Sequence, residues 1–134
     1  MTIDPRGRPR PVPICFVVTD SARTPLALYT PIDEKTKETS DPLRLARVRD
    51  VVARPAAAVL VDSWDEDWDR LWWIRVTGVA TIVAADEPSA TEERARAIEA
   101  LRAKYPQYAT HALEDRPIIR VVAERITSWG LDRP

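Results

Sequence analysis

A chain of 134 residues, 45% of them apolar and 31% charged, has the size and composition of one globular domain with a buried core, so we expect a single domain over 1–134. A formal net charge of -1 argues against nucleic-acid binding through bulk charge, although Met1–Arg54, with ten basic and seven acidic residues, favours a local anion site. One cysteine and one histidine cannot build a disulfide or an ordinary zinc site, and no apolar run approaches the roughly 20 residues of a membrane span.

The first half of the chain predicts two short strands, a polar loop and a helix. Apolar residues at every second position predict a strand over Pro11–Val18 and a shorter one over Leu26–Thr30. Pro31–Ser40 is a polar loop. Asp41 can cap a helix, because apolar residues behind it repeat at helical spacing and Pro55 lies just beyond its end.

The second half predicts three strands and one helix. The almost uniformly apolar Ala56–Asp62 indicates a strand covered on both faces, and Leu71–Ala85 a long strand with a bend or bulge at Gly78. Ser89–Glu92 has the pattern of a capping box, and a helix follows it. Pro117–Trp129 is the last strand. The residues expected on the buried face of the helix are Ala95, Ile98 and Leu101.

This order of elements predicts a mainly β fold. The strands are short and the two helices do not alternate strictly with them, as they would in a doubly wound sheet. A Greek-key barrel with peripheral helices fits the pattern better.

Four stretches of the chain, in this order and spacing, resemble the pyridoxamine-phosphate-oxidase-like family, and in particular its actinobacterial, deazaflavin-dependent branch. These stretches are Asp4–Pro13, Leu28–Lys37, Leu45–Asp62 and Asp65–Ala80. The resemblance implies a split β-barrel of the FMN-binding-protein type that forms a homodimer. Relatives begin further upstream, so this chain starts inside their first strand, and Arg10 stands where many of them have histidine.

The resemblance implies that Arg47 holds the phosphate of a cofactor, because relatives carry a basic residue at this position. Lys35 and Lys37, in the loop before the helix, would add positive charge, and Arg44 lies three residues from Arg47 on the same helix face. The alternative is a solvated helix and loop with scattered charges.

Relatives place the ring system of the cofactor against the segment that corresponds to Val12, Pro13 and Ile14, and a hydroxyl at Tyr29 or Thr30 near its phosphate. Since prolines 11 and 13 cannot donate to a ladder, we expect this strand to be an edge or to line an opening. The alternatives are an ordinary edge strand, a tyrosine at the border of the core and a threonine in a turn.

A cluster of tryptophans falls in the stretch where relatives form their subunit interface. The resemblance implies that Trp72 and Arg75 face the cofactor of the partner subunit, with each cofactor site in a groove between the two subunits. For Trp64 and Trp73 we favour a role in the core or interface without cofactor contact.

The sequence offers no catalytic side chain: Cys15 and His111 form no recognisable pair, and three glycines cannot supply a dinucleotide or phosphate loop. This fits an oxidoreductase in which the cofactor performs the chemistry. The resemblance implies hydride transfer between the deazaflavin coenzyme F420 and a small organic substrate. The alternatives are FMN as cofactor, a carrier without turnover, a haem-binding relative and a structural dimer with a vestigial site.

The residues after Met1 are not those of a signal peptide, so we expect a cytoplasmic protein.

Overall fold

The computed structural model describes residues 1–19, 25–32 and 41–131, which contain seven strands, two α-helices and three 3-10 helices. The strands are β1 (Thr2–Ile3), β2 (Pro9–Arg10), β3 (Val17–Val18), β4 (Ala27–Pro31), β5 (Ala56–Ser63), β6 (Trp72–Val83) and β7 (Ile118–Trp129). The α-helices are α1 (Ala46–Ala53) and α2 (Thr91–Lys104), and the 3-10 helices are η1 (Pro42–Arg44), η2 (Pro88–Ala90) and η3 (Pro106–Thr110).

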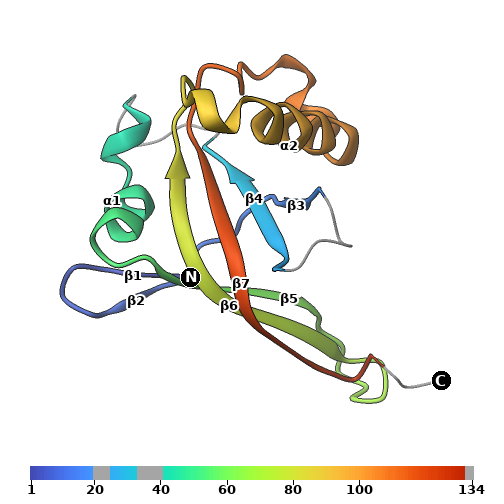
Figure 1. Ribbon diagram of the computed structural model, residues 1–134. Helices are drawn as coiled ribbons and strands as arrows, with labels where there is room; N and C mark the ends of the chain where they lie inside the picture. The colour runs from blue at the N-terminus through green and yellow to red at the C-terminus, as the bar shows by residue number, and fades with distance from the viewer. Residues whose placement is uncertain (20–24, 33–40, 132–134) are drawn as a thin grey trace.

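Five strands form one antiparallel sheet in the order β3-β4-β7-β6-β5, and β1 and β2 form a separate hairpin (Figure 1). A long connection containing α1 joins β4 to β5, and β4 pairs with β7, which is a Greek-key arrangement. The predicted mainly β fold with peripheral helices is therefore confirmed. The expected split barrel forms only in part, because β3 and β5 remain at opposite edges of the described sheet.

The β1–β2 hairpin lies against the outer edge of β5. The amino group of Met1 donates to the carbonyl of Ala58 at 2.7 Å, and the amide of Ala58 donates to the carbonyl of Met1 at 3.1 Å. This reciprocal pair is the hydrogen-bonded pair of an antiparallel ladder. It attaches the hairpin to β5, which is otherwise an unpaired edge of the five-stranded sheet.

A β-bulge bends the two longest strands. The pairing of β6 with β7 shifts between Thr77 and Gly78, as the glycine in the sequence predicts. A Cβ atom at position 78 would lie 1.9 Å from the carbonyl oxygen of Val122, so only glycine fits here. Beyond the bulge, the ends of β5, β6 and β7 extend away from both helices (Figure 1).

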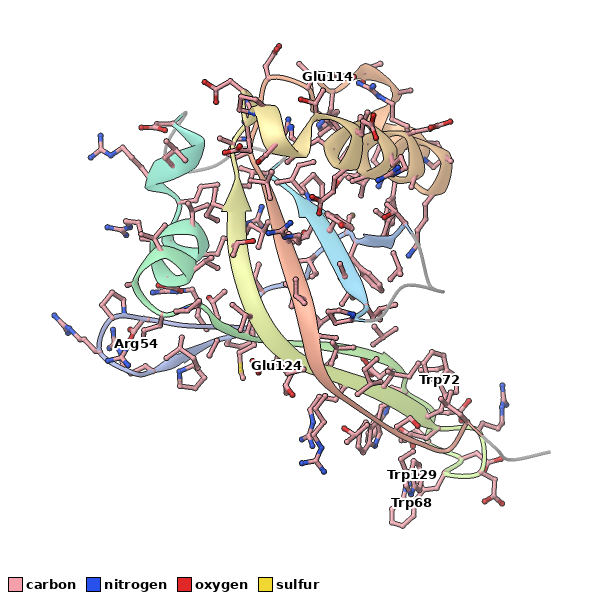
Figure 2. All side chains as sticks on the ribbon, in the orientation of Figure 1. Arg54, Trp68, Trp72, Glu114, Glu124 and Trp129 are labelled. Carbon is pink, nitrogen blue, oxygen red and sulfur yellow. The ribbon has the colours of Figure 1, made fainter. Side chains whose placement is uncertain are left out.

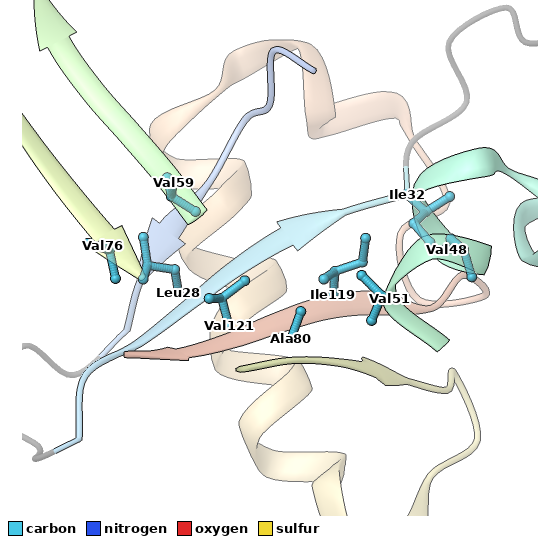
Figure 3. Packing of buried hydrophobic residues seen from close by; sticks show 9 residues of the cluster. All are labelled: Leu28, Ile32, Val48, Val51, Val59, Val76, Ala80, Ile119 and Val121. Carbon is cyan, nitrogen blue, oxygen red and sulfur yellow. The ribbon is translucent and has the colours of Figure 1, made fainter. Parts of the chain in front are cut away.

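Two apolar clusters pack on opposite faces of the sheet, because neighbouring residues of a strand point to opposite sides. The first cluster lies between the sheet and α1 and contains Leu28, Ile32, Val48, Val51, Val59, Val76, Ala80, Ile119 and Val121 (Figure 3). The second lies beneath α2 and contains Val17, Tyr29, Ala97, Ile98, Leu101, Tyr108, Leu113 and Ile118. Each helix thus closes one face of the sheet.

Three local predictions are wrong in detail. The strand predicted over Pro11–Val18 joins the ladder only at its last two residues, because the prolines before them have no N–H to donate. The capping box at Ser89 does not form: Ala90 is the N-cap of α2, and the carboxylate of Glu87 instead accepts the amide of Ser89. Ala97 rather than Ala95 faces the core.

Other local predictions hold. The side chain of Asp41 accepts the amide of Leu43 at 2.9 Å and so caps η1, while β5 and β7 match their predicted ranges within one residue. However, the helix predicted behind Asp41 is divided, because α1 begins only at Ala46, with Leu45 as its N-cap and no side-chain cap. In addition, β5 is not covered on both faces in the single chain, since Leu60 is 62% exposed. None of the helices in the described ranges is long and apolar enough to cross a membrane.

Candidate functional site

A groove of about 860 Å³ lies beside β5 and β6. One wall is the extended segment Pro11–Ile14, and the other is formed by β5 and by Trp72, Trp73 and Arg75 of β6. Five predicted site residues line this groove: Val12, Pro13, Ile14, Trp72 and Arg75. The fold therefore brings together two stretches that lie about sixty residues apart in the sequence.

The residues that line the groove are mainly apolar. The proline-rich segment presents the side chains of Val12 and Pro13, both exposed, and Trp72 faces the groove from β6. The guanidinium of Arg75 lies 5.7 Å from the centre of the Trp73 ring, a cation–π contact that orients it at the rim. Figure 2 shows Trp72 at the end of the sheet that extends beyond the helices.

A smaller pocket of about 40 Å³ adjoins the groove, and two arginines are among the residues that line this pocket. It shares Val12 and Ile14 with the groove and adds Arg10, Thr30 and Arg47. Arg47, on the first turn of α1, donates from Nη2 to the carbonyl of Pro31 at 3.3 Å, which holds its side chain against the end of β4. Two arginines and a threonine are thus among the residues that line one pocket.

The hydroxyl of Thr30 is buried and, among the residues that the structure describes, has no hydrogen-bond partner. Leaving a buried polar group unpaired costs on the order of 1–3 kcal/mol. A ligand oxygen at this position would recover that free energy, and an anionic one would also gain from the neighbouring arginines. The residues present therefore suit an anionic group such as a phosphate.

The structure does not bring Tyr29 to this pocket. Its side chain points to the opposite face of β4, where its hydroxyl donates to Glu93 of α2 at 2.6 Å. Burial, and then this hydrogen bond, raise the pKa of Tyr29 to about 12, so the phenol stays a donor. Tyr29 therefore connects the sheet to α2.

The other predicted basic residues lie apart from the pocket or outside the structure. Arg44 is exposed at the end of η1 and lines neither cavity, since the 3-10 turn separates it from the face of α1 that carries Arg47. Lys35 and Lys37 lie outside the described residues.

Sequence reasoning did not assign three residues that line these cavities. Arg10 reaches the pocket through β2, and Leu60 and Trp64 line the groove from β5 and the turn after it. Arg10 carried a signal, because it stands where relatives often have histidine. Trp64 belongs to the tryptophan cluster, for which we favour a core or interface role without cofactor contact, and Leu60 carried no signal, because nothing in the sequence says which side of β5 faces the groove.

The structure is that of a small, mainly β domain in which an apolar groove beside a bent antiparallel sheet adjoins a pocket with two arginines. The family model of pyridoxamine 5'-phosphate oxidase matches residues 1–130, and the chain belongs to this family. Its members include flavin- and deazaflavin-dependent oxidoreductases.

Among solved structures, the fold is similar to that of the protein Atu2129, of unknown function, from Agrobacterium tumefaciens str. C58. The TM-score is 0.59 at 16% sequence identity, and the match covers 99% of this chain and 50% of that one. The chain thus spans about half the length of this neighbour, and the likeness concerns the fold alone. No curated protein matches the chain.

Proposed function

We propose that this protein is an oxidoreductase that binds coenzyme F420 and transfers a hydride between it and a small organic substrate. One observation carries the proposal: the apolar groove adjoins a pocket that is lined by Arg47 and by Thr30, whose buried hydroxyl has no hydrogen-bond partner among the described residues. Family membership adds that domains of this kind bind flavins or related cofactors. When bound, the ring of the cofactor supplies the hydride chemistry.

The residues of the chain would bind and orient that ring. Arg47 and Thr30 would hold the phosphate, with Arg10 next to them, and the segment Val12–Ile14 would support one face of the ring. Pro13 contributes no backbone donor, so the amides of Val12 and Ile14 are the ones that could bond to the ring edge. The apolar walls would exclude water from the reacting atoms.

The choice of F420 over FMN rests on sequence alone. The two lysines before α1 would suit the longer acidic tail of the deazaflavin coenzyme, and FMN, which lacks such a tail, is the alternative. Both cofactors carry a phosphate and a planar ring, so the groove and pocket suit either. A titration with each, followed by fluorescence, separates them.

We also propose that the working site lies at the interface of a homodimer. Leu60 and Trp64, which line the groove, are 62% and 74% exposed in the single chain, and Trp68 at the tip of the same extension is 74% exposed. Exposed apolar residues that are contiguous with a groove are typical of subunit interfaces. A second copy covering this surface would turn the groove into an enclosed site.

The sharpest test of the cofactor site is Thr30→Val, which removes the hydroxyl but keeps the shape of the side chain. We expect the apo-protein to become more stable, by about 1 kcal/mol, because a buried unpaired hydroxyl is lost. We expect binding of F420 to weaken about tenfold, because the phosphate loses a partner. Arg47→Ala should weaken it at least as much, and Arg96→Ala, an exposed arginine on α2, should not.

Each outcome decides something. If Thr30→Val raised stability and left both cofactor titrations unchanged, the phosphate would not lie in this pocket. If the intact protein bound neither F420 nor FMN, the oxidoreductase proposal would fail and a structural dimer with a vestigial site would remain. Oxidation of the bound reduced cofactor only when a substrate is added distinguishes an enzyme from a carrier.

The dimer is tested by light scattering coupled to size-exclusion chromatography. We expect a dimer mass at micromolar concentration and a monomer for Leu60→Glu. Val52→Glu is the matched control, because Val52 is 74% exposed on α1, away from the groove. A monomer mass for the unmodified chain would contradict the dimer.

A further inference from the structure

We propose that a second anion site lies between the β1–β2 hairpin and α1, and that it takes a dianionic oxyanion of the phosphate class. The site is a cavity of about 380 Å³, which we call the arginine pocket. Its lining residues are Asp4, Pro5, Arg6, Arg8, Arg10, Arg49 and Asp50. It shares Arg10 with the pocket that contains Thr30, but its other lining residues are separate, so Arg6 and Arg49 test it apart from the cofactor proposal.

The turn of the hairpin is built to hold arginines at this cavity. One carboxylate oxygen of Asp4 accepts the backbone amides of Arg6 and Arg8, both at 2.9 Å, and Gly7 takes a φ of 83°. The other oxygen accepts Nε of Arg8 at 2.8 Å and lies 2.7 Å from its Nη2. Asp4 is buried, and its carboxylate therefore fixes both the backbone and one guanidinium of the turn.

The second aspartate fixes another arginine from the side of α1. Asp50 is buried, and its Oδ2 accepts the hydroxyl of Thr2 at 2.8 Å and Nε of Arg10 at 2.7 Å. Among the described residues, the terminal nitrogens of Arg10 make no hydrogen bond, which leaves its planar fork available. A buried carboxylate that holds an arginine by Nε presents the remaining two nitrogens to a ligand in bidentate geometry.

The charges at the cavity do not cancel. Its four arginines face two aspartates, and both aspartates are already engaged by Arg8 and Arg10. Arg6 and Arg49 are exposed and make no ion pair within the described ranges. Arg54 adds a further guanidinium at the rim, since its Nη2 donates to the carbonyl of Pro5 at 3.2 Å, and Figure 2 shows it beside the hairpin.

A concave site with this composition favours one kind of ligand. Several guanidinium groups around one cavity suit a compact anion with several acceptor oxygens, and a phosphate dianion meets each fork with two of them. The excess positive charge favours two negative charges over one. The site lies at the opposite end of the molecule from the tryptophan-rich extension, so a dimer formed there would leave it open (Figure 1).

The test uses the full chain labelled with ¹⁵N and inorganic phosphate as the probe, at about pH 8, where phosphate groups are chiefly dianions. Ionic strength is held constant with chloride. We expect saturable shifts of the amides of Arg6, Gly7, Arg8 and Arg49. The double variant Arg6→Gln, Arg49→Gln should raise the apparent Kd about tenfold, while Arg96→Gln on α2 leaves it unchanged.

Three results would overturn the site: shifts that rise linearly without saturation, an equal loss in Arg96→Gln, or shifts centred on Thr30 and Arg47. Because Arg6 and Arg49 hold no other residue in place, the double variant should keep the spectrum of the rest of the chain, which verifies its fold. Titration of the same variant with F420 and FMN separates the two sites, since the cofactor affinity should not change. The two titrations therefore test the cofactor site and the arginine pocket separately, and either proposal can fail while the other stands.

Discussion

Replacement of Gly78 by alanine should destabilise the protein strongly, because the bulge brings two backbones together. The added Cβ would lie 1.9 Å from the carbonyl oxygen of Val122 and 2.9 Å from its carbon. Both atoms belong to the backbone of β7, the central strand of the sheet, so no side chain can rotate away. One of the two long strands must move, and the bulge must open.

The expected change in the free energy of unfolding for Gly78→Ala is the sum of two opposing contributions. In open space, exchanging a strand glycine for alanine stabilises a protein by roughly 0.5–1 kcal/mol, because the unfolded chain loses freedom. Overpacking costs about 1–3 kcal/mol even where side chains can adjust, and here backbone must shift. We therefore expect a net loss of about 3 kcal/mol, which for a chain of 134 residues corresponds to a fall in Tm of about 10 °C.

Thermal and urea unfolding, followed by circular dichroism, measure this difference. Gly7→Ala is the control, since Gly7 has a φ of 83° but no atom within 4 Å of the added Cβ. It should lose only about 1 kcal/mol through backbone strain. If Gly78→Ala were as stable as the unmodified protein, or more stable, the close approach of β6 and β7 would be wrong.

Three further substitutions test other parts of the structure. Leu101→Ala, on the fully buried face of α2, should lose about 3 kcal/mol in urea unfolding, and a loss below about 1 kcal/mol would contradict the packing of α2. Asp50→Asn breaks the ion pair between the buried Asp50 and the partly exposed Arg10 and should lose about 2 kcal/mol, and adding Arg10→Gln to this variant should not increase the loss. Hydrogen bonds from the amide of Arg8, and then its guanidinium, lower the pKa of Asp4 to about 2 in the folded state, from 3.8. The stability from Asp4 is therefore complete above about pH 4 and lost as the pH falls towards about 2. Asp4→Asn should flatten the stability of the protein over this window, and an unchanged acid profile would exclude the pairing.

The sequence predicted those strands that bury one face and repeat at period two. In β6 the residues from Val76 to Ala80 alternate between buried and less buried positions, and Gly78 marked the bulge in advance. Pro11–Val18 also has apolar residues at every second position, but only its last two residues pair with a neighbouring strand. Two prolines in this segment have no amide N–H to donate to a ladder. Alternation shows which residues share a face, and hydrogen bonding decides whether a strand pairs.

The candidate site shows the same limit. Alternation along β4 requires Tyr29 and Thr30 to face opposite sides, and only the packing of α2 against one of those sides decides that Thr30 faces the pocket. The meeting of Arg10 with Asp50, forty positions later, depends on the hairpin folding over α1. Contacts at such separations leave no periodic signal in one sequence.

The central position of β7 has a consequence for how the chain is made. β7 pairs with both β4 and β6, yet it is the last of the described strands to leave the ribosome. Until residues 118–129 emerge, β4 can pair only with β3, and the β5–β6 hairpin has no partner on its inner side. Synthesis proceeds at about 5–20 residues per second, so the nascent chain exposes these two unpaired edges for some seconds. The sheet therefore cannot be completed before β7 has emerged, and a chaperone that covers β4 and β6 during this interval would protect the stage most exposed to aggregation.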